Sequence, residues 1–436
     1  SDGNAEQQVE ASWCLTNIAG GTHEDALKVI DAMPYFVAFL GGDNKPLQEQ
    51  ALWAVGNLAA DCQEFRDHLM RSGALVPMIE IFTRSKVPEL LSNAAWALSN
   101  LARGTQTPAT PFCQAGIIRP LIELLHQGVR VLEDGTVDSV AEKRPLIIEC
   151  CWLASLLTAK EREVVYALVE NGILPALYNN MHFRDFRILT PLVRSLGNIF
   201  SLPGIPADWL NLFLTNQSFV ALWNEVLLST VSSGTVPGSL LNSNHALVKE
   251  AAWCTSSMMA CTDAQKSVLS EYGVVNALQV LVAEAIFSVK KEAAAALFNY
   301  ICDGHQRRVN EVMTPHVLRA IIEMVTQPDV EAARQALNMI HIVLSLPGGP
   351  GCVESCGGMD ALDHVIYMEG GDAQLKDKAA WLSDTFYGGD YGVLEEDLQS
   401  AQQMVPSISH DGTTFNFSAG QGTNSTPSSP ASIRKE

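Results

Sequence analysis

The chain has 436 residues, of which 47% are hydrophobic, and a formal net charge of −20. Its length exceeds what one ordinary hydrophobic core can serve, so several domains or a repeat architecture are needed. The acidic balance argues against direct nucleic-acid binding, which depends on Lys and Arg at the phosphates. No apolar run reaches the roughly 18 residues of a membrane span, and no secretory signal opens the chain, so no membrane contact is expected.

The cysteines favour a reducing compartment and no metal site. All ten are scattered, and the only close pairs, Cys150–Cys151 and Cys352–Cys356, have no further Cys or His at metal-ligand spacing. Several others fall inside apolar helical runs, where a free thiol behaves as a small hydrophobic group. We therefore expect neither a metal nor a cofactor.

The first predicted elements are near copies of one helix. Three segments carry it: ASWCLTNIAG (11–20), ALWAVGNLAA (51–60) and AAWALSNLARG (94–104). Their tryptophans Trp13, Trp53 and Trp96 lie 40 and 43 residues apart. Weaker copies follow around Trp152, Arg194, Trp253, Ala295, Asn338 and Trp381. A helical repeat of about 42 residues predicts an all-α, right-handed armadillo-repeat superhelical solenoid.

A second marker keeps phase with the tryptophan position. Twenty residues after it, a glycine-containing turn opens an apolar helix, at Gly73, Gly116, Gly172, Gly273 and Gly358. No β-strand alternation of useful length competes with this helical pattern.

The repeat pattern also predicts the domain organisation. It covers residues 1–390 as about nine repeats. The first is incomplete, because the chain begins at the last helix of a repeat, and we expect further sequence upstream. Two longer gaps, of 56 and 59 residues, place insertions near 128–144 and 229–244, which are expected to be loops between helices. Residues 399–436 are rich in Ser, Gly, Thr, Asn and Pro, and are expected to form a disordered tail.

The tryptophans are predicted to face away from the core. At about 100° per residue, Asn17 lies beside Trp13 and opposite an apolar stripe of Ala11, Leu15 and Ile18. The next two copies repeat this arrangement with the pairs Trp53/Asn57 and Trp96/Asn100. A single Trp is more often a core residue, but three such pairs favour an open row. Slots between the indoles would take Lys or Arg stems, and the amides could hold an extended peptide.

These segments resemble the importin alpha (karyopherin alpha) family of nuclear-import adaptors. The strings that carry the resemblance are EASWCLTNIAGGTHED, EQALWAVGNLAADCQEFRD, NAAWALSNLARG, VRSLGNI, KEAAWCTSS and KEAAAALFNYICDG, and it covers roughly residues 9–390. The resemblance implies an adaptor that binds nuclear localisation signals rich in Lys and Arg. It also implies that the adaptor links this cargo to importin beta and shuttles between cytoplasm and nucleus.

The resemblance implies a major cargo site on the N-terminal repeats. Its residues are Trp13, Asn17, Gly21, Trp53, Asn57, Asp61, Trp96 and Asn100. Asp61 matches the acidic residue that receives the most buried cargo lysine, and Gly21 matches a backbone contact at the same pocket. The family has a threonine nearby where this chain has Ala26, so a slightly altered pocket is expected.

A minor site is implied further along the chain. Its residues are Trp152, Arg194, Asn198, Trp253, Glu292 and Asn299. Ser257 replaces the asparagine that pairs with Trp253, and Ala295 replaces the tryptophan that pairs with Asn299. Because a missing indole removes a slot wall, the second basic cluster of a bipartite cargo is expected to contribute less.

The resemblance also implies two protein partners. A basic N-terminal segment of the family binds importin beta and folds back on the groove as an autoinhibitor, and this sequence holds no such segment. The last repeats, here around Trp381, are implied to bind an export receptor with Ran-GTP.

Two other classes of protein, an enzyme and a different armadillo scaffold, fit the sequence less well. An enzyme is disfavoured, because the sequence has no P-loop, HExxH or GxSxG motif. The histidines, including His23 and His68, are interpreted as solvated loop residues. The second class is a catenin-like armadillo scaffold that binds other extended peptides. A positively charged groove would favour that alternative.

Overall fold

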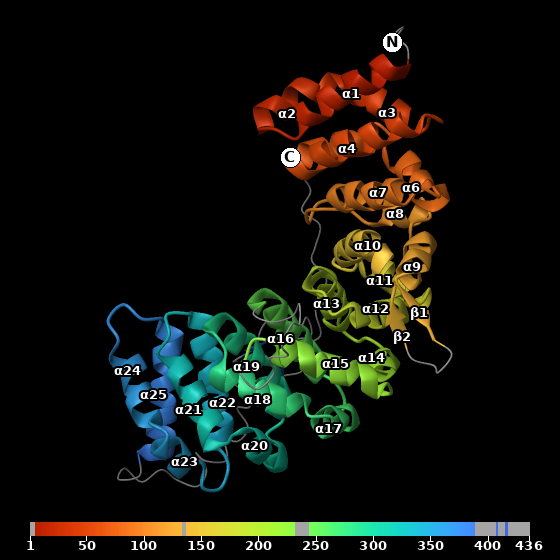
Figure 1. The fold of residues 1–436 in the computed structure, drawn as a ribbon. Coiled ribbons are helices and arrows are strands. Elements are labelled where there is room, and N and C mark those ends of the chain that lie inside the picture. Colours follow the sequence, from red (N-terminus) through yellow and green to blue (C-terminus); the bar gives the residue numbers. More distant parts are fainter. Residues whose placement is uncertain (1–4, 133–136, 232–243, 389–406, 409–414, 417–436) are drawn as a thin grey trace, which may run out of the picture. The chain divides into compact units, whose positions relative to one another are not determined.

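A computed structural model describes residues 5–132, 137–231, 244–388, 407–408 and 415–416 (Figure 1). The chain divides into two compact units, Ser1–Tyr300 and Ile301–Glu436, whereas the repeat pattern predicts one run of repeats over 1–390. The two units are described separately. Among the described residues, no helix combines the length and apolarity that a membrane span needs.

The helices of the first unit follow one three-helix order after α1 (Ala5–Ala19). The first helices of the repeats are α2 (His23–Val29), α5 (Gln63–Arg71), α8 (Thr110–Gln114), α11 (Arg162–Glu170), α14 (Ala207–Leu214) and α17 (Asp263–Glu271). The second helices are α3 (Met33–Leu40), α6 (Leu75–Arg84), α9 (Ile118–His126), α12 (Ile173–Asn180), α15 (Gln217–Leu228) and α18 (Val274–Glu284). The third helices are α4 (Lys45–Asp61), α7 (Pro88–Leu101), α10 (Arg144–Leu157), α13 (Phe186–Phe200), α16 (His245–Met259) and α19 (Phe287–Ile301).

The second unit continues the same order. Its helices are α20 (Gln306–Val312), α21 (Pro315–Val325), α22 (Val330–Leu344), α23 (Gly349–Ser355), α24 (Gly358–Tyr367) and α25 (Ala373–Tyr387). Short 3-10 helices, η1 (Ile30–Ala32), η2 (Ala141–Lys143) and η3 (Met181–Phe183), extend helix ends in the first unit.

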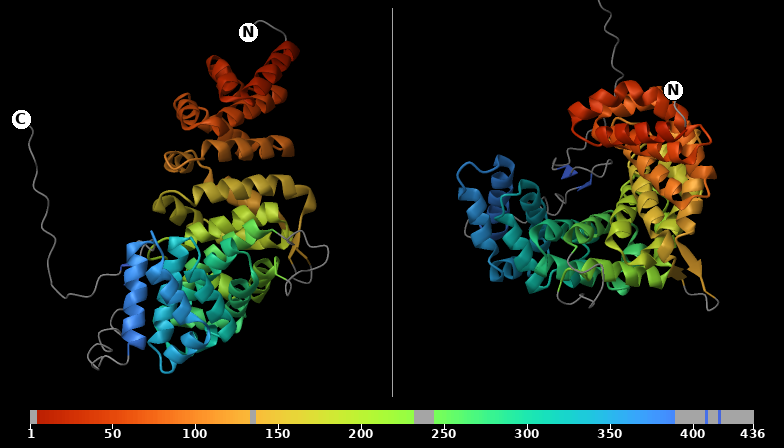
Figure 2. Two further views of the ribbon diagram at one scale, coloured as in Figure 1. Left: turned by 90° about the vertical axis from the view of Figure 1, so that its left-hand side faces the viewer. Right: turned by 45° about the horizontal axis from the view of Figure 1, so that its top comes forward.

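The core of the first unit lies between successive third helices. Helix α1 packs on α4, α4 on α7, α7 on α10, α10 on α13 and α13 on α16 (Figures 1 and 2). In α4 and α7 the predicted apolar stripe is fully buried, with Val55, Leu58, Leu98 and Leu101 each 0% exposed. This arrangement confirms the predicted armadillo-repeat solenoid, in which each repeat buries its apolar face against its neighbours.

The apolar stripe predicted for the first copy is wrong. In α1, Ile18 is 41% exposed, Ala11 is exposed and Leu15 is half-buried. The buried side is instead polar, and includes Ser12 and Thr16. The reason is that α1 packs mainly on α4 and α2. Only the side of α1 that faces these two helices is therefore buried.

The glycine turns between first and second helices use the left-handed region of backbone space. The φ angle is +78° at Gly73, +89° at Gly116, +94° at Gly172 and +81° at Gly273. In the last repeat the left-handed residue is Gly357, at φ +86°, and Gly358 is the first residue of α24, as the helix start predicted there requires. A Cβ at Gly358 would lie 2.2 Å from Val353, so this second glycine is required for close packing.

The two insertions and the tail are only partly described. Between α9 and α10, β1 (Val129–Val131) pairs with β2 (Val137–Ser139) as an antiparallel hairpin, where the sequence predicts a loop. Branched valines favour this extended pairing. Most of the insertion near 229–244 lies outside the described residues, as does most of the predicted tail. Within the tail, β3 (Ser407–Ile408) pairs with β4 (Phe415–Asn416).

A capping box starts α2, beside the candidate site. The Thr22 hydroxyl accepts from the Asp25 N–H at 3.3 Å, and the Asp25 carboxylate accepts from the Thr22 N–H at 3.4 Å. We expect Thr22→Ala to lower the free energy of unfolding by about 1 kcal/mol, because a backbone donor loses its partner. Urea denaturation followed by circular dichroism measures this. Thr262 makes the same box at α17, so Thr262→Ala should show a similar loss, and unchanged midpoints in both variants would contradict the prediction.

Candidate peptide-binding groove

A row of indole rings lies along the third helices of the first unit. Trp13 on α1 is 54% exposed and Trp53 on α4 is 40% exposed. Trp96 on α7, Trp152 on α10 and Trp253 on α16 are half-buried. A core tryptophan of the same unit looks different, because Trp223 is 0% exposed and donates its Nε1–H to Thr255 Oγ1 at 3.0 Å.

Two glycines make room for this row. A Cβ at Gly56 would lie 2.2 Å from the Trp96 ring, and a Cβ at Gly197 would lie 2.1 Å from the Trp253 ring. Each glycine stands three residues after the tryptophan position of its own repeat. The indole of one repeat therefore lies directly against the third helix of the repeat before it. The sequence analysis did not identify these two glycines, although their shared offset from the tryptophan position could have indicated them.

The predicted slot between Trp53 and Trp96 is closed in this structure. Their ring centroids are 4.9 Å apart and their planes meet at 46°. A methylene stem that lies between two rings needs a contact distance of about 3.5–4 Å to each ring. A lysine stem can therefore enter this slot only after one of the rings rotates.

The asparagines of the row connect neighbouring repeats. Each Nδ2 donates to a carbonyl of the preceding third helix: Asn57 to Thr16 at 3.2 Å, Asn100 to Gly56 at 3.2 Å, Asn198 to Ser155 at 3.1 Å and Asn299 to Ser256 at 2.8 Å. We call these four bonds the asparagine ladder. Asn17 differs, because its Nδ2 donates to Trp13 O in its own helix, at 2.9 Å.

The ladder changes which amides reach solvent. All three asparagines of the major site are predicted to lie on the open face, and Asn17 is exposed while Asn57 is half-buried. Asn100, in contrast, is 1% exposed, because it is bound to the neighbouring helix. No described residue donates to its Oδ1, which is buried. A peptide N–H can reach this oxygen only if the atoms that bury it move.

The ladder should stabilise the solenoid. We expect Asn57→Ala to lower the free energy of unfolding by about 0.5–1.5 kcal/mol, since it removes one bond between repeats. Asn17→Ala is the matched control, and it should cost less because its bond lies within one helix. Urea titration of the two variants decides this, and an equal loss in both would contradict a bond that joins repeats.

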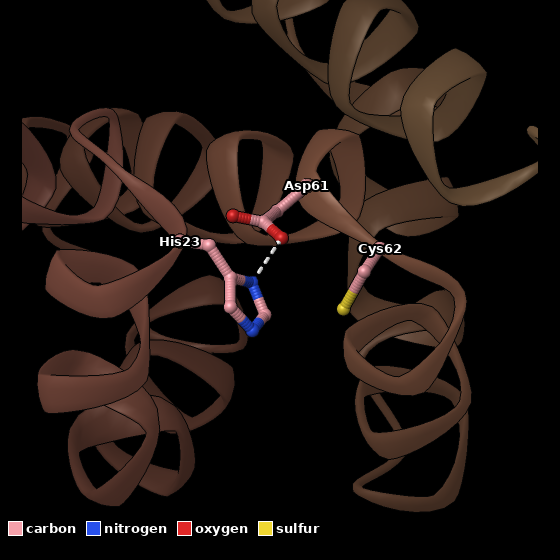
Figure 3. Close-up of side chains that lie close together, drawn as sticks. All are labelled: His23, Asp61 and Cys62. Atoms are coloured by element: carbon pink, nitrogen blue, oxygen red, sulfur yellow. Dashed lines mark hydrogen bonds and ion pairs between the residues drawn. The ribbon is translucent and has the colours of Figure 1, made fainter.

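The Asp61 carboxylate is engaged by a histidine. Asp61 Oδ1 lies 2.7 Å from His23 Nδ1, and the Asp61 side chain is 17% exposed although the residue as a whole is exposed. The His23 ring stacks on Phe65 with centroids 5.4 Å apart. The ligand atoms of His23, Asp61 and Cys62 all lie within 4.8 Å of one another (Figure 3). The sequence does not predict this cluster, because residues 23 and 61 are brought together only by the packing of two repeats.

The other residues assigned to this pocket lie nearby in sequence. Gly21 is exposed in the turn between α1 and α2, and its N–H donates to Ile18 O at 3.0 Å. Ala26, which stands where the family has threonine, is 0% exposed. It is part of the core and offers no hydroxyl to a ligand.

In the second half of the row, the chain fills a cation position with its own arginine. The Arg194 guanidinium lies 5.9 Å from the centre of the Trp152 ring and forms an ion pair with Glu250 on the next third helix. This pairing raises the pKa of Arg194. A ligand cation at Trp152 must therefore compete with Arg194.

Carboxylates run beside the indole row. Glutamates stand three residues before the tryptophan position at Glu10, Glu149, Glu250 and Glu292. Residues three apart share a helix face. Glu10 is exposed and the others are half-buried, and burial raises the pKa of Glu149. Of these glutamates, only Glu292 was identified from the sequence. Beside Trp53 and Trp96 the same position holds Gln50 and Asn93, so the carboxylates accompany the first and the later members of the row.

Comparisons with known proteins agree with this architecture. The sequence model of the family described as "Armadillo/beta-catenin-like repeat" matches residues 22–60 and 62–103, which enclose two complete three-helix repeats. The chain is 29% identical over 409 residues to "Importin subunit alpha-9" of Arabidopsis thaliana, with 89% of this chain and 73% of that protein covered. It is 25% identical over 424 residues to "Importin subunit alpha-1b" of Oryza sativa subsp. japonica, covering 94% and 71%.

The chain is an armadillo-repeat solenoid, and over most of its length its sequence is similar to importin alpha subunits. Solved structures support the fold alone. The crystal structure of an engineered protein superposes with a TM-score of 0.60 at 19% identity, covering 92% of this chain and 97% of that one. A computationally designed armadillo repeat protein "for modular peptide recognition" superposes with a TM-score of 0.50 at 21% identity, covering 62% and 99%. These matches confirm the predicted fold class and the predicted resemblance.

Proposed function

We propose that this armadillo protein binds nuclear localisation signals, rich in Lys and Arg, as extended peptides along its indole row. The observation that carries the proposal is the row itself, with Trp13 and Trp53 exposed and the carboxylates of Glu10 and Asp61 on the same helices. Exposed indoles flanked by carboxylates suit the aliphatic stem and the charged end of a basic side chain. They do not suit an acidic peptide, which a catenin-like groove would take.

The major site is proposed to lie on α1, α4 and α7. A lysine ammonium would take the place of the His23 ring at Asp61, where the carboxylate is mostly covered and the attraction is less screened than at an open surface. The next basic stem would enter between Trp53 and Trp96 after one ring rotates. Each cation at an indole is worth about 0.5–2 kcal/mol, depending on how far it is desolvated.

The minor site is proposed to bind more weakly. Ala295 provides no indole wall and Ser257 provides no amide. Arg194 already occupies the face of Trp152. A second basic cluster must therefore displace a cation that is held by Glu250, and the gain from linking two clusters is expected to be small.

The cellular role follows the family resemblance. We propose that the protein is a nuclear-import adaptor, acts by binding and not by catalysis, and moves between cytoplasm and nucleus. Importin beta, and an export receptor with Ran-GTP near the last repeats, are the proposed protein partners. Binding assays with these partners would test this part separately.

The cargo proposal is tested by fluorescence anisotropy with a labelled lysine-rich peptide. We expect Asp61→Asn to weaken binding by about three- to tenfold, and added salt to weaken wild-type binding, because an ion pair is lost or screened. Asp208→Asn is the matched control, because Asp208 is an exposed carboxylate on the first helix α14 and should change affinity little. Tighter binding of an acidic peptide than of the basic one would overturn the proposal.

A further inference from the structure

Three metal-ligand side chains meet where two repeats join. His23 is the first residue of α2, Asp61 is the last residue of α4 and Cys62 follows directly. His23 Nδ1 and Asp61 Oδ1 are 2.7 Å apart, and one imidazole nitrogen, one carboxylate oxygen and the Cys62 sulfur all lie within 4.8 Å of one another. Figure 3 shows the ring, the carboxylate and the thiol grouped around one point. Cys62 forms no disulfide.

The donor set selects the kind of metal. Imidazole nitrogen, carboxylate oxygen and thiolate sulfur together suit Zn²⁺, whereas Mg²⁺ and Ca²⁺ prefer oxygen ligands alone. Zinc bonds of about 2.0–2.3 Å in a tetrahedron put neighbouring ligand atoms roughly 3.3–3.8 Å apart. At 2.7 Å, His23 Nδ1 and Asp61 Oδ1 lie closer than this spacing, so the two side chains must move apart to admit the metal. Three protein ligands leave the fourth position open to water.

The surroundings favour a cation at this point. The His23 ring is held against Phe65, which is 1% exposed, so its orientation is restricted. The Asp61 side chain is 17% exposed, which limits competition from bulk water.

We propose that His23, Asp61 and Cys62 form a Zn²⁺ site, and that zinc and a cargo lysine exclude one another there because both require the Asp61 carboxylate. Zinc replaces the hydrogen bond between His23 and Asp61, and Cys62 binds as a thiolate whose proton passes to solvent. The metal site depends only on these three residues. The exclusion of cargo rests on the proposed peptide-binding function.

Cobalt(II) titration of the full chain tests the site, because a thiolate bound to Co²⁺ gives a near-ultraviolet charge-transfer band. We expect one equivalent of Co²⁺ to produce this band and one equivalent of Zn²⁺ to remove it. In calorimetry, Cys62→Ser and His23→Ala should each weaken Zn²⁺ binding by about tenfold or more. The matched controls are Cys14→Ser and His126→Ala, which remove an exposed thiol and an exposed imidazole elsewhere and should bind as wild type does. No band in the wild type, or a band that survives Cys62→Ser, would overturn the metal site.

A competition experiment tests the exclusion. We expect Zn²⁺ at about ten times its wild-type Kd to weaken binding of the lysine-rich peptide to wild type by about tenfold, and to weaken its binding to Cys62→Ser by at most about twofold. Equal peptide affinity with and without Zn²⁺ in the wild type would overturn the exclusion. If the peptide fails to bind without any metal, the proposed function fails, and the cobalt titration still decides the metal site.

Discussion

A protein with both Trp53 and Trp96 replaced by alanine is expected to bind a lysine-rich peptide about 5- to 30-fold more weakly than wild type, a loss of at least about 1–2 kcal/mol. These rings are the two walls of one slot, and they lie in contact at 4.9 Å in this structure. A bound lysine stem replaces the contact between rings with two contacts to its own methylenes. Without the walls, neither the methylene contacts nor the cation–π attraction remains.

Fluorescence anisotropy measures this loss, and Trp209→Ala is its control. Trp209 is a half-buried tryptophan on the first helix α14 that packs against Tyr166, with centroids 4.8 Å apart. Its removal should leave peptide affinity close to wild type. Peptide binding should also change the intrinsic fluorescence of the wild type, because Trp53 and Trp96 must separate. Unchanged affinity in the double variant would remove the indole row as the binding site.

Lys378→Met is expected to remove a pH-dependent contribution to the free energy of unfolding between about pH 8 and pH 10.5. Lys378 lies on α25 of the second unit, with its Nζ 3.1 Å from His341 Nδ1 and 4.7 Å from the centre of the Trp381 ring. Burial lowers its pKa from 10.5 to about 8. Methionine fills a similar volume without an ionisable group. Its contribution to stability therefore does not change with pH, although the contacts to His341 and Trp381 are lost.

The pH dependence of this effect has a definite sign. The unfolded chain holds the Lys378 proton more tightly than the folded chain, so wild-type stability from this group rises as pH increases from about 8 to 10.5. The stability of Lys378→Met relative to wild type should therefore be highest and constant below pH 8, and should fall as the pH rises toward 10.5. Denaturant titrations at pH 7 and pH 10 measure it. Lys376→Met, on the same helix, is the control, and an equal shift in both variants would contradict a burial effect at Lys378.

Much of the candidate groove could be predicted from periodicity. The offset between Trp53 and Asn57 puts both on one helix face, and Val55 and Leu58 fall on the opposite face whatever the neighbours are. The same reasoning failed for α1. Periodicity shows which side of a helix is apolar, but burial of Ile18 also requires a helix that covers it.

Two features of the indole row could not be predicted: the contact that closes the slot between Trp53 and Trp96, and the cation position at Trp152 that Arg194 fills. Whether Trp53 touches Trp96, and whether Arg194 lies over Trp152, depends on distances between successive third helices. Gly56 permits the close approach of Trp96, but the sequence of one helix does not fix where the rings of its neighbour lie. The asparagine ladder is similar, because its acceptors are main-chain carbonyls, which no side-chain pattern reports.

The sequence by itself therefore determined the repeat length, the solenoid, the buried stripes of the inner third helices and the outward row of indoles. All of these are helical properties, set by spacings of three and four residues. Only the tertiary structure decided which polar groups meet: His23 with Asp61 and Cys62, and Arg194 with Glu250. These partners come from different repeats, and the packing of one layer on the next brings them within bonding distance.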